Sequence, residues 1–211
     1  MDLSLIPVTP SLSKSPFDCG NEELNLFFRQ FAAGNHRKNI AKTFVALADS
    51  GRIAGYFSLC AAGVAFEEFA TQHQKGLPRY PVPAVRIARL AVAVDLHGQH
   101  IGAWLLKQAF DKIFTIAASA GVYAVVVDAI DDKAKGFYKK YGFLEFPGSR
   151  PSLFLPLRTI EAGARNRGKA QGRQSFGIWP LLTSSARTSH RTPQAPPRGP
   201  AARSPGGHSQ P

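Results

Sequence analysis

Cysteine is scarce in this chain, which carries only Cys19 and Cys60 among its 211 residues. Two cysteines without metal-ligand spacing exclude a disulfide scaffold and a cysteine-based metal site, and they are typical of a reducing compartment. Long apolar runs are also missing. None reaches the about 18 residues of a membrane-spanning helix, and the N-terminus lacks the charged-then-apolar pattern of a signal peptide. We therefore expect a cytoplasmic protein that uses no metal, with Cys60 as a small core residue of an apolar strand.

Acidic residues are few as well: 14 Asp and Glu stand against 26 Lys and Arg, for a net charge of +12. The imbalance is greatest in residues 161–211, which hold eight basic residues, one acid and few apolar side chains. Such a segment cannot bury enough apolar surface to offset the entropy lost on ordering it. We predict one folded domain over residues 1–160 and a disordered basic tail, rich in Pro, Arg, Gly and Ser, over 161–211. The tail favours polyanions without specifying one, and its composition suits a solubilising extension equally well.

The two common phosphate-binding loops are absent. Neither Gly-x-x-x-x-Gly-Lys-Ser/Thr nor Gly-x-Gly-x-x-Gly occurs, which argues against a P-loop nucleoside-triphosphatase and a dinucleotide-binding fold. Instead, an apolar strand within 84–95 leads to the turn His-Gly-Gln-His-Ile-Gly at 97–102, which opens a helix. One face of that helix carries Leu105, Leu106, Ala109, Phe110 and Ile113. The free N–H groups and the positive dipole end at its start suit phosphate, so we expect a cofactor that bears a pyrophosphate.

A second informative segment follows a β-branched strand at 122–128, which is typical of a sheet interior. Residues 134–143 read Ala-Lys-Gly-Phe-Tyr-Lys-Lys-Tyr-Gly-Phe. We predict a helix over 131–140 that ends at Gly142 in a left-handed conformation.

The rest of the domain alternates short strands with one further helix. Helix 20–33 has Leu24, Phe27, Phe28 and Phe31 on one face, and Asp18 or Asn21 is its expected N-cap. The remaining patterns predict strands at 3–8, 42–48, 53–62 and 152–157, a hairpin turn at 49–52 and a less regular segment at 63–83.

Both motifs resemble those of the GNAT superfamily of acetyl-CoA-dependent N-acetyltransferases. The turn at 97–102 is similar to motif A, Arg/Gln-x-x-Gly-x-Gly/Ala, with His97 where the motif has Arg and His100 at its middle Gly. Residues 134–143 are similar to the family's Ala-x-x-Phe-Tyr-x-x-x-Gly-Phe. The resemblance covers about residues 1–160. It implies an α/β (α+β) GNAT fold, with a mixed, mostly antiparallel sheet flanked by helices and a splayed central strand.

The same resemblance implies acetyl-CoA as the acetyl donor. By position in the two motifs and the central strand, it assigns the following residues to cofactor binding: Leu90, Ala91, Val92, His97, Gly98, Gln99, His100, Ile101, Gly102, Ala103 and Phe137. The side chain at 100 is a departure that bears directly on how the turn holds a pyrophosphate.

The segment 17–28 narrows the family further. Phe-Asp-Cys-Gly-Asn-Glu-Glu-Leu-Asn-Leu-Phe-Phe resembles the opening of the TacT/AtaT-type toxins of type II toxin–antitoxin systems, and the segments 55–59 and 89–92 match the same group. That resemblance implies acetylation of the α-amino group of aminoacyl-tRNA, which blocks translation. It also implies a ribbon-helix-helix antitoxin as partner and a possible homodimer.

Acetyl transfer to an amine needs a proton for the leaving thiolate, and Tyr138 of the Phe-Tyr motif is the candidate general acid. A phenol ordinarily has a pKa of about 10 and is protonated at neutral pH. The alternative is a packing tyrosine whose hydroxyl has a structural partner. Tyr141 is the less favoured candidate, because the motif places it past the sulfur.

A strong base is not obvious in the sequence. Asp128 and Asp131 could serve, but residues at the end of a strand are as often helix caps. An α-amine ordinarily has a pKa of about 7.7–8.0, so a useful fraction is neutral near pH 7 without a base. This chemistry is consistent with an aminoacyl-tRNA substrate.

A tRNA substrate needs a basic surface, because phosphate contacts supply most non-specific affinity. The candidate RNA-binding residues are Arg29, Arg37, Lys38, Lys42, Lys75, Arg79, Arg86 and Arg89. Each could instead be a solvated surface charge, and Arg89 could be buried and paired.

Two other functions stay open at this point. One is a general GNAT enzyme that acts on a small amine or a protein N-terminus. The other is a non-catalytic relative that binds nucleic acid or a partner, which the altered turn at His100 keeps in view.

Overall fold

The computed structural model describes residues 2–148 and 151–160, so the predicted tail over 161–211 lies outside the described residues. In the described part, seven strands form one sheet with the order β1-β2-β3-β4-β5-β7-β6. Neighbours pair antiparallel except β4 and β5, which are parallel. The strands are β1 (Leu3–Pro7), β2 (Lys42–Ala48), β3 (Ile53–Val64), β4 (Val82–Val92), β5 (Ala124–Asp128), β6 (Leu144–Glu145) and β7 (Ser152–Pro156). The predicted mixed, mostly antiparallel sheet is confirmed.

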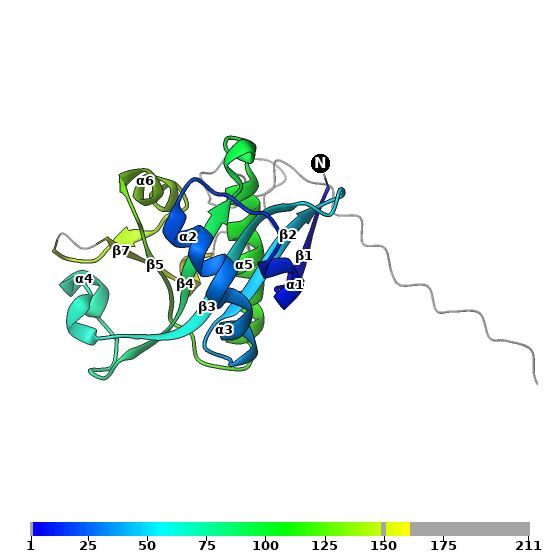
Figure 1. Cartoon of the computed structure of the whole chain (residues 1–211). Coiled ribbons are helices and arrows are strands. Elements are labelled where there is room, and N and C mark those ends of the chain that lie inside the picture. The colour runs from blue at the N-terminus through cyan, green and yellow to red at the C-terminus, as the bar shows by residue number, and fades with distance from the viewer. Residues whose placement is uncertain (1, 149–150, 161–211) are drawn as a thin grey trace, which may run out of the picture.

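Helical segments cover both faces of this sheet (Figure 1). The N-terminal group consists of α1 (Pro10–Ser13), α2 (Glu22–Leu26), the π-helix η1 (Phe27–Ala32) and α3 (Ala33–Arg37). The others are the 3₁₀ turns η2 (Phe66–Glu68) and η3 (Val94–Leu96), and the helices α4 (Thr71–Gln74), α5 (Ile101–Ala117) and α6 (Asp132–Lys140). No helix in the described residues has the length and apolar character needed to cross a bilayer.

The helix predicted over 20–33 begins at Glu22 and continues through η1 to Arg37. Asn21 is its N-cap, because the Asn21 side chain accepts a hydrogen bond from the Leu24 amide at 3.0 Å. The predicted apolar face is wrong at one position: Phe31 is 49% exposed, while Ala32 is fully buried. The cause is the wider π turn, which moves the buried positions to a spacing of four residues, at Leu24, Phe28 and Ala32.

Helix α5 packs on one face of β3 and β4, and the α2–η1–α3 group packs on the other. The alternation along β3 shows this, since a Cβ added at Gly55 would lie 2.9 Å from Leu105 of α5, while the next residue, Tyr56, packs against Phe28. The Tyr56 hydroxyl also donates to the Leu24 carbonyl at 2.8 Å. The predicted inner face of α5 is confirmed, since Leu105, Leu106, Ala109, Phe110 and Ile113 are all 0% exposed.

Strand β4 carries one extra residue in the middle of its pairing with β3. Ser58 pairs with Arg89 and Leu59 with Ile87, which leaves Ala88 as a β-bulge. Pairing between β4 and β5 runs from Ala84 to Ile87 and stops there. From the bulge onward β4 therefore separates from β5, and this confirms the splayed central strand.

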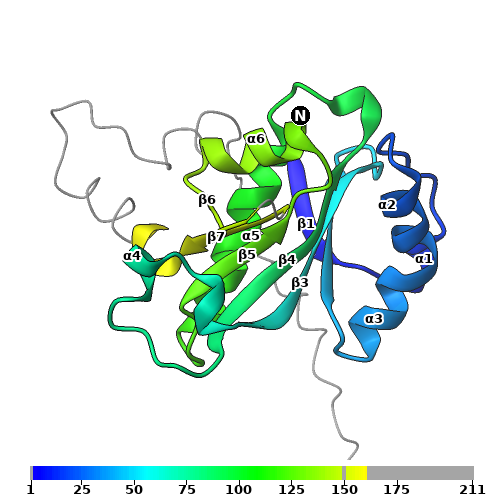
Figure 2. The same cartoon turned by 90° about the vertical axis from the view of Figure 1, so that its left-hand side faces the viewer.

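The face of the sheet opposite α5 has two separate covers (Figure 2). The α2–η1–α3 group covers one part, and a second apolar cluster around Phe69, Phe146 and Phe154 fills the part under α4. Between the two covers Cys60 is only partly buried, so the prediction that it is a core residue is wrong. The reason is positional, since no helix lies over this part of β3.

Candidate active site

A cleft of about 1100 Å³ lies where β4 leaves β5, between the starts of α2, α5 and α6. Of the predicted cofactor-binding residues, it is lined by Leu90, Ala91, Val92, His97, Gly98, His100, Ile101, Gly102, Ala103 and Phe137. Gln99 does not line it, since its side chain donates to the Asp95 carbonyl at 3.4 Å within the turn. The structure thus brings the two motifs together in one cavity.

The start of α5 supplies donors to this cleft. The first bond of the helix runs from the Trp104 amide to the His100 carbonyl at 3.1 Å. The amides of Ile101, Gly102 and Ala103 precede that bond, so they have no acceptor within the helix. All three residues line the cleft, where these amides and the positive end of a 17-residue helix favour an anion.

His100 adopts a left-handed backbone conformation, which glycine takes most readily. Its φ is 61°, and it is the N-cap of α5. A non-glycine residue in this region costs about 1 kcal/mol. The turn therefore places a strained, non-glycine residue directly before the first amides of α5.

Tyr138 comes from α6, whose N-cap Asp131 accepts from the Ala134 amide at 2.6 Å. The Tyr138 ring is buried against Phe137 and Phe143, with ring centroids 5.2 and 5.3 Å away, yet the residue lines the cleft. None of the described residues hydrogen-bonds to its hydroxyl. Burial, and next the charge of Asp128, raise the pKa of this phenol, so it keeps its proton throughout the neutral range.

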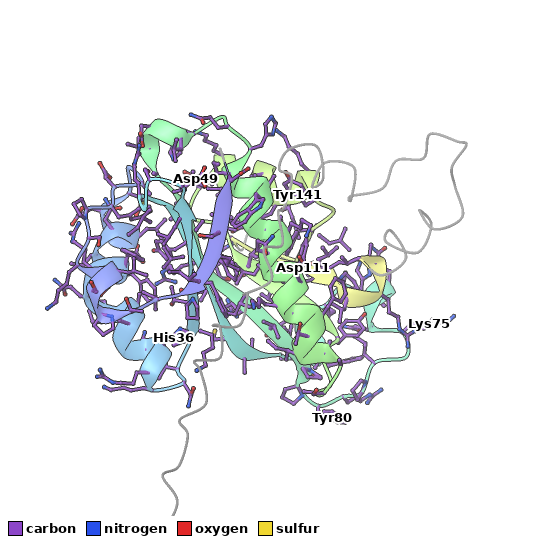
Figure 3. All side chains as sticks on the ribbon, turned by 90° about the vertical axis from the view of Figure 1, so that its right-hand side faces the viewer. His36, Asp49, Lys75, Tyr80, Asp111 and Tyr141 are labelled. Atoms are coloured by element: carbon purple, nitrogen blue, oxygen red, sulfur yellow. The ribbon has the colours of Figure 1, made fainter. Side chains whose placement is uncertain are left out.

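Tyr141 also lines the cleft, one turn further along the chain (Figure 3). It is buried, and its ring lies 5.0 Å from that of Phe137. Burial raises the pKa of its phenol too. Two protonated tyrosines therefore face the same cavity.

The two candidate bases have structural partners. Asp131 caps α6, which is the alternative role expected for a residue at the end of a strand. The Asp128 carboxylate accepts from the Arg86 guanidinium and, at 2.6 Å, from the Ser152 hydroxyl. Its position at the end of β5 holds it in this ion pair.

One wall of the cleft was not predicted. Cys19, Gly20, Asn21 and Leu24 line it from the start of α2. The Asn25 side chain holds this wall in place. Its Oδ1 accepts from the Cys19 amide at 2.9 Å, and its Nδ2 donates to the Asp18 carboxylate at 2.8 Å. The signal was present, because the motif at 17–28 spans this segment, but nothing in it indicates contact with a distant turn.

The Asp18 backbone carries that contact: its carbonyl accepts from the Val94 amide at 2.9 Å. The bond joins the segment before α2 to the segment before α5. Near the start of α6, Ile130, Asp132 and Lys133 also line the cleft, as does Lys140 at the end of this helix, and these were also missed.

On the opposite face of the sheet the bulge at Ala88 aligns two arginines. Residues three apart on a regular strand face opposite sides, but the extra residue puts Arg86 and Arg89 on the same side, opposite Cys60 and Ser58. We call the surface formed by Cys60, Arg86, Arg89 and Asp128 the arginine strip. Arg89 of the strip lies against Phe27 of η1.

Arg89 is only partly satisfied in this strip. Its guanidinium lies 5.2 Å from the centre of the Phe27 ring, donates to the Ala88 carbonyl at 2.7 Å and lies 3.6 Å from Glu23. Its Nε is buried and has no partner among the described residues. Arg89 is therefore neither a free surface charge nor a fully paired one.

The other predicted RNA-binding residues are dispersed. Arg29 pairs with Glu22 at 2.5 Å, and Lys42 donates to the His36 carbonyl at 3.3 Å. Arg37 and Lys38 end α3, while Lys75 and Arg79 follow α4. Figure 3 shows Lys75 and Tyr80 toward the opposite end of the sheet from Tyr141. The structure gathers Arg86 and Arg89, not the whole set. Within residues 2–148 and 151–160, no three His, Cys, Asp or Glu side chains lie together as a metal site.

Known proteins resemble this chain in sequence and fold. Residues 39–145 match the acetyltransferase (GNAT) domain family. A tRNA-acetylating toxin of Mycobacterium tuberculosis (strain ATCC 25618 / H37Rv) is 30% identical over 146 residues, which cover 69% of this chain and 87% of the toxin.

Solved structures agree with the sequence relatives. AtaT complexed with acetyl-methionyl-tRNAfMet is 29% identical, with a TM-score of 0.69 over 76% of this chain and 98% of that one. A mutant AtaT toxin bound to the C-terminus of the antitoxin AtaR and acetyl-CoA is 28% identical, with a TM-score of 0.64 over 77% and 98%. With both motifs in one cleft and a matching domain, this chain belongs to the GNAT family of acetyltransferases.

Proposed function

We propose that this protein is an acetyl-CoA-dependent N-acetyltransferase that acetylates the α-amine of aminoacyl-tRNA and thereby acts as a toxin that blocks translation. The observation that carries the proposal is the opening of β4 from β5 at the point where the α5 amides and Tyr138 line one cleft. The similarity to tRNA-acetylating toxins supports the choice of substrate.

The residues of the cleft fit acetyl-CoA. The amides of Ile101, Gly102 and Ala103 would hold its diphosphate, and the unpaired edge of β4 at Leu90–Val92 offers backbone groups to its pantetheine arm. Phe137 forms part of the apolar wall. An AtaT structure that contains acetyl-CoA supports this assignment.

Bound acetyl-CoA would supply an acetyl thioester. The nitrogen–carbon bond would form as the carbon–sulfur bond breaks, the sulfur would take up a proton, and the amine nitrogen would release one, which restores the proton donor. Tyr138 is our candidate for that donor, since the residue lines the cleft and its hydroxyl is protonated and has no hydrogen-bond partner in the described residues. No carboxylate needs to act as a base, because an α-amine is partly neutral near pH 7.

The arginine strip supports a nucleic-acid acceptor. It lies on the face of β4 opposite α5, so a substrate there could reach the opened strand from the other side. Arg86, which also pairs with Asp128, and Arg89 provide two cations, and the buried Nε of Arg89 has no acceptor among the described residues. We assign both to phosphate contacts near the acceptor end, and the six dispersed residues to weaker contacts further along the tRNA.

The partners follow from the same proposal. An antitoxin is expected, by analogy with AtaT and AtaR, and we infer the ribbon-helix-helix class for it. We also propose a homodimer, and the cytoplasm as the compartment, because aminoacyl-tRNA is there.

Acetylation of total aminoacyl-tRNA by purified protein tests the proposal. We expect acetyl groups on charged tRNA and none on free amino acids or polyamines. Transfer to small amines or peptide N-termini alone would favour a general GNAT enzyme. Acetyl-CoA binding without transfer to any amine would favour a non-catalytic relative. Growth arrest on induced expression is the matching test in cells.

A further inference from the structure

Two histidines stand at the mouth of the cleft where the motif has an arginine and a glycine. His97 and His100 are both exposed, and both line the cleft beside the first turn of α5. An arginine at 97 would be charged at every physiological pH, whereas an imidazole changes charge between about pH 5 and 8. The substitution therefore replaces a permanent cation with a titratable one.

The contacts of both imidazoles leave a nitrogen free for a ligand. His97 donates from Nε2 to the Val92 carbonyl at 3.0 Å. This leaves Nδ1 to accept a proton and, once protonated, to donate to an anion. The His100 imidazole makes no hydrogen bond to any described residue. His100 is the N-cap of α5, with φ at 61°, so it directly precedes the free amides of this helix.

Other ionisable groups lie around the cleft. Asp95 pairs with Arg52, and that hydrogen bond holds the pKa of the Asp95 carboxyl below its usual value. Burial raises the pKa of the Cys19 thiol and of the two tyrosine phenols. The other charged residues that line the cleft are Asp131, Asp132, Lys133 and Lys140.

We propose that His97 and His100 make cofactor binding pH-dependent, with the imidazolium forms holding the coenzyme A diphosphate together with the α5 amides. The inference rests on the proposed function, since it concerns the same cofactor. Affinity rises as the pH falls from about 8 to 6, because protonation adds positive charge next to a dianion. By linkage, cofactor binding takes up protons, up to one for each imidazole that titrates.

Calorimetric titration of the full chain with coenzyme A over about pH 6–8 tests this inference. We expect the dissociation constant at about pH 8 to exceed that at pH 6 by about tenfold, which corresponds to about one pKa unit of coupling. Titrations at pH 7 in buffers of different ionisation enthalpy should show net proton uptake. Dephospho-coenzyme A serves as a second ligand, because a phosphate monoester itself titrates near about pH 6 and would blur the profile.

Variants assign the effect to the imidazoles. The double variant His97→Gln/His100→Gln should bind coenzyme A about as weakly at pH 6 as the wild type does at pH 8. His97→Arg should restore tight binding at pH 8. His73→Gln, which changes a histidine of α4 outside the cleft, is the matched control and should keep the wild-type profile. Unchanged circular dichroism confirms that each variant is folded.

Each result has a distinct meaning. A wild-type dissociation constant that changes less than about twofold over this range, or a double variant that keeps the wild-type slope, overturns the role of the histidines. A folded protein that takes up no coenzyme A at any pH refutes the proposed function instead.

Discussion

The cofactor cleft and the arginine strip share strand β4 but differ in how the chain builds them. Most of the cleft comes from two continuous stretches, 90–103 and 130–141, in which backbone amides and one phenol provide the chemistry. The strip takes Cys60 from β3, Arg86 and Arg89 from β4 and Asp128 from β5, and its chemistry is ionic. The cleft is thus encoded mostly by local sequence, whereas the arginine strip exists only once three strands have paired.

The largest expected effect is a loss of turnover from a change in the cleft that leaves the arginine strip unaltered. Tyr138→Phe removes the only proton donor that we assign to the leaving sulfur, so we expect turnover to fall by at least about tenfold. Coenzyme A affinity should stay unchanged, because the ring and its packing against Phe137 and Phe143 remain. Single-turnover acetylation and calorimetry measure the two quantities.

Tyr141→Phe is the matched control, since it makes the same change just beyond the same helix and in the same cleft. We expect less than about threefold loss of turnover. Equal turnover of wild type and Tyr138→Phe would remove Tyr138 from the mechanism, and a larger loss at Tyr141 would transfer the role to that residue.

The next largest effect is a loss of tRNA affinity from a change in the arginine strip that leaves the cleft unaltered. In Arg86→Ala/Arg89→Ala two phosphate contacts are lost, so tRNA affinity should fall by at least about tenfold and the salt dependence of binding should become shallower by about one to two ions. Coenzyme A affinity should not change. Filter binding of charged tRNA at several salt concentrations provides the measurement.

Lys75→Ala/Arg79→Ala carries the same charge change away from the cleft. If the strip contacts the acceptor end, this distal pair should weaken tRNA binding by less than the Arg86 and Arg89 pair. The reverse order would place the RNA on the other end of the sheet.

A further prediction concerns how the close packing of β3 on β4, the strand that both regions share, contributes to the free energy of unfolding. Gly55 lies on β3 opposite Val92, and a Cβ there would lie 2.5 Å from the Ala91 carbonyl oxygen. Because a backbone atom cannot move aside, Gly55→Ala should lower the free energy of unfolding by about 2–4 kcal/mol. Gly34→Ala in α3, where no atom of the described residues lies within 4 Å of the new Cβ, should raise it by about 0.5–1 kcal/mol. Urea denaturation compares the two, and a neutral Gly55→Ala would show that β3 and β4 can move apart.

The smallest effect concerns the chain beyond both regions. Deletion of residues 161–211 should leave the domain folded and its coenzyme A affinity unchanged. The reason is that the core already includes the last described residue, Ile160, which is only 3% exposed. The deletion removes eight basic residues, so a modest loss of tRNA affinity at low salt is expected. Loss of the cooperative thermal transition would contradict the boundary at 160.

Prediction from the sequence succeeded where a feature depends on neighbours in the chain. The turn at 97–102, the α6 cap at Asp131 and the left-handed Gly142, with φ at 84°, are set by backbone chemistry over a few residues. It failed at Phe31, because a helical pattern assumes 3.6 residues per turn and η1 is wider. It failed at Cys60, because an apolar strand does not reveal which part of its face a helix will cover.

The sequence by itself determined the family, the turn at 97–102 and the tyrosine motif, since each of these features is carried by short runs of neighbouring residues. Only the tertiary structure decided that Ala88 forms a bulge, that β4 leaves β5 after Ile87 and that Arg86 and Arg89 face the same side. The physical reason is that strand register depends on hydrogen bonds between segments far apart in the chain, and one extra residue reverses the face of every side chain that follows it.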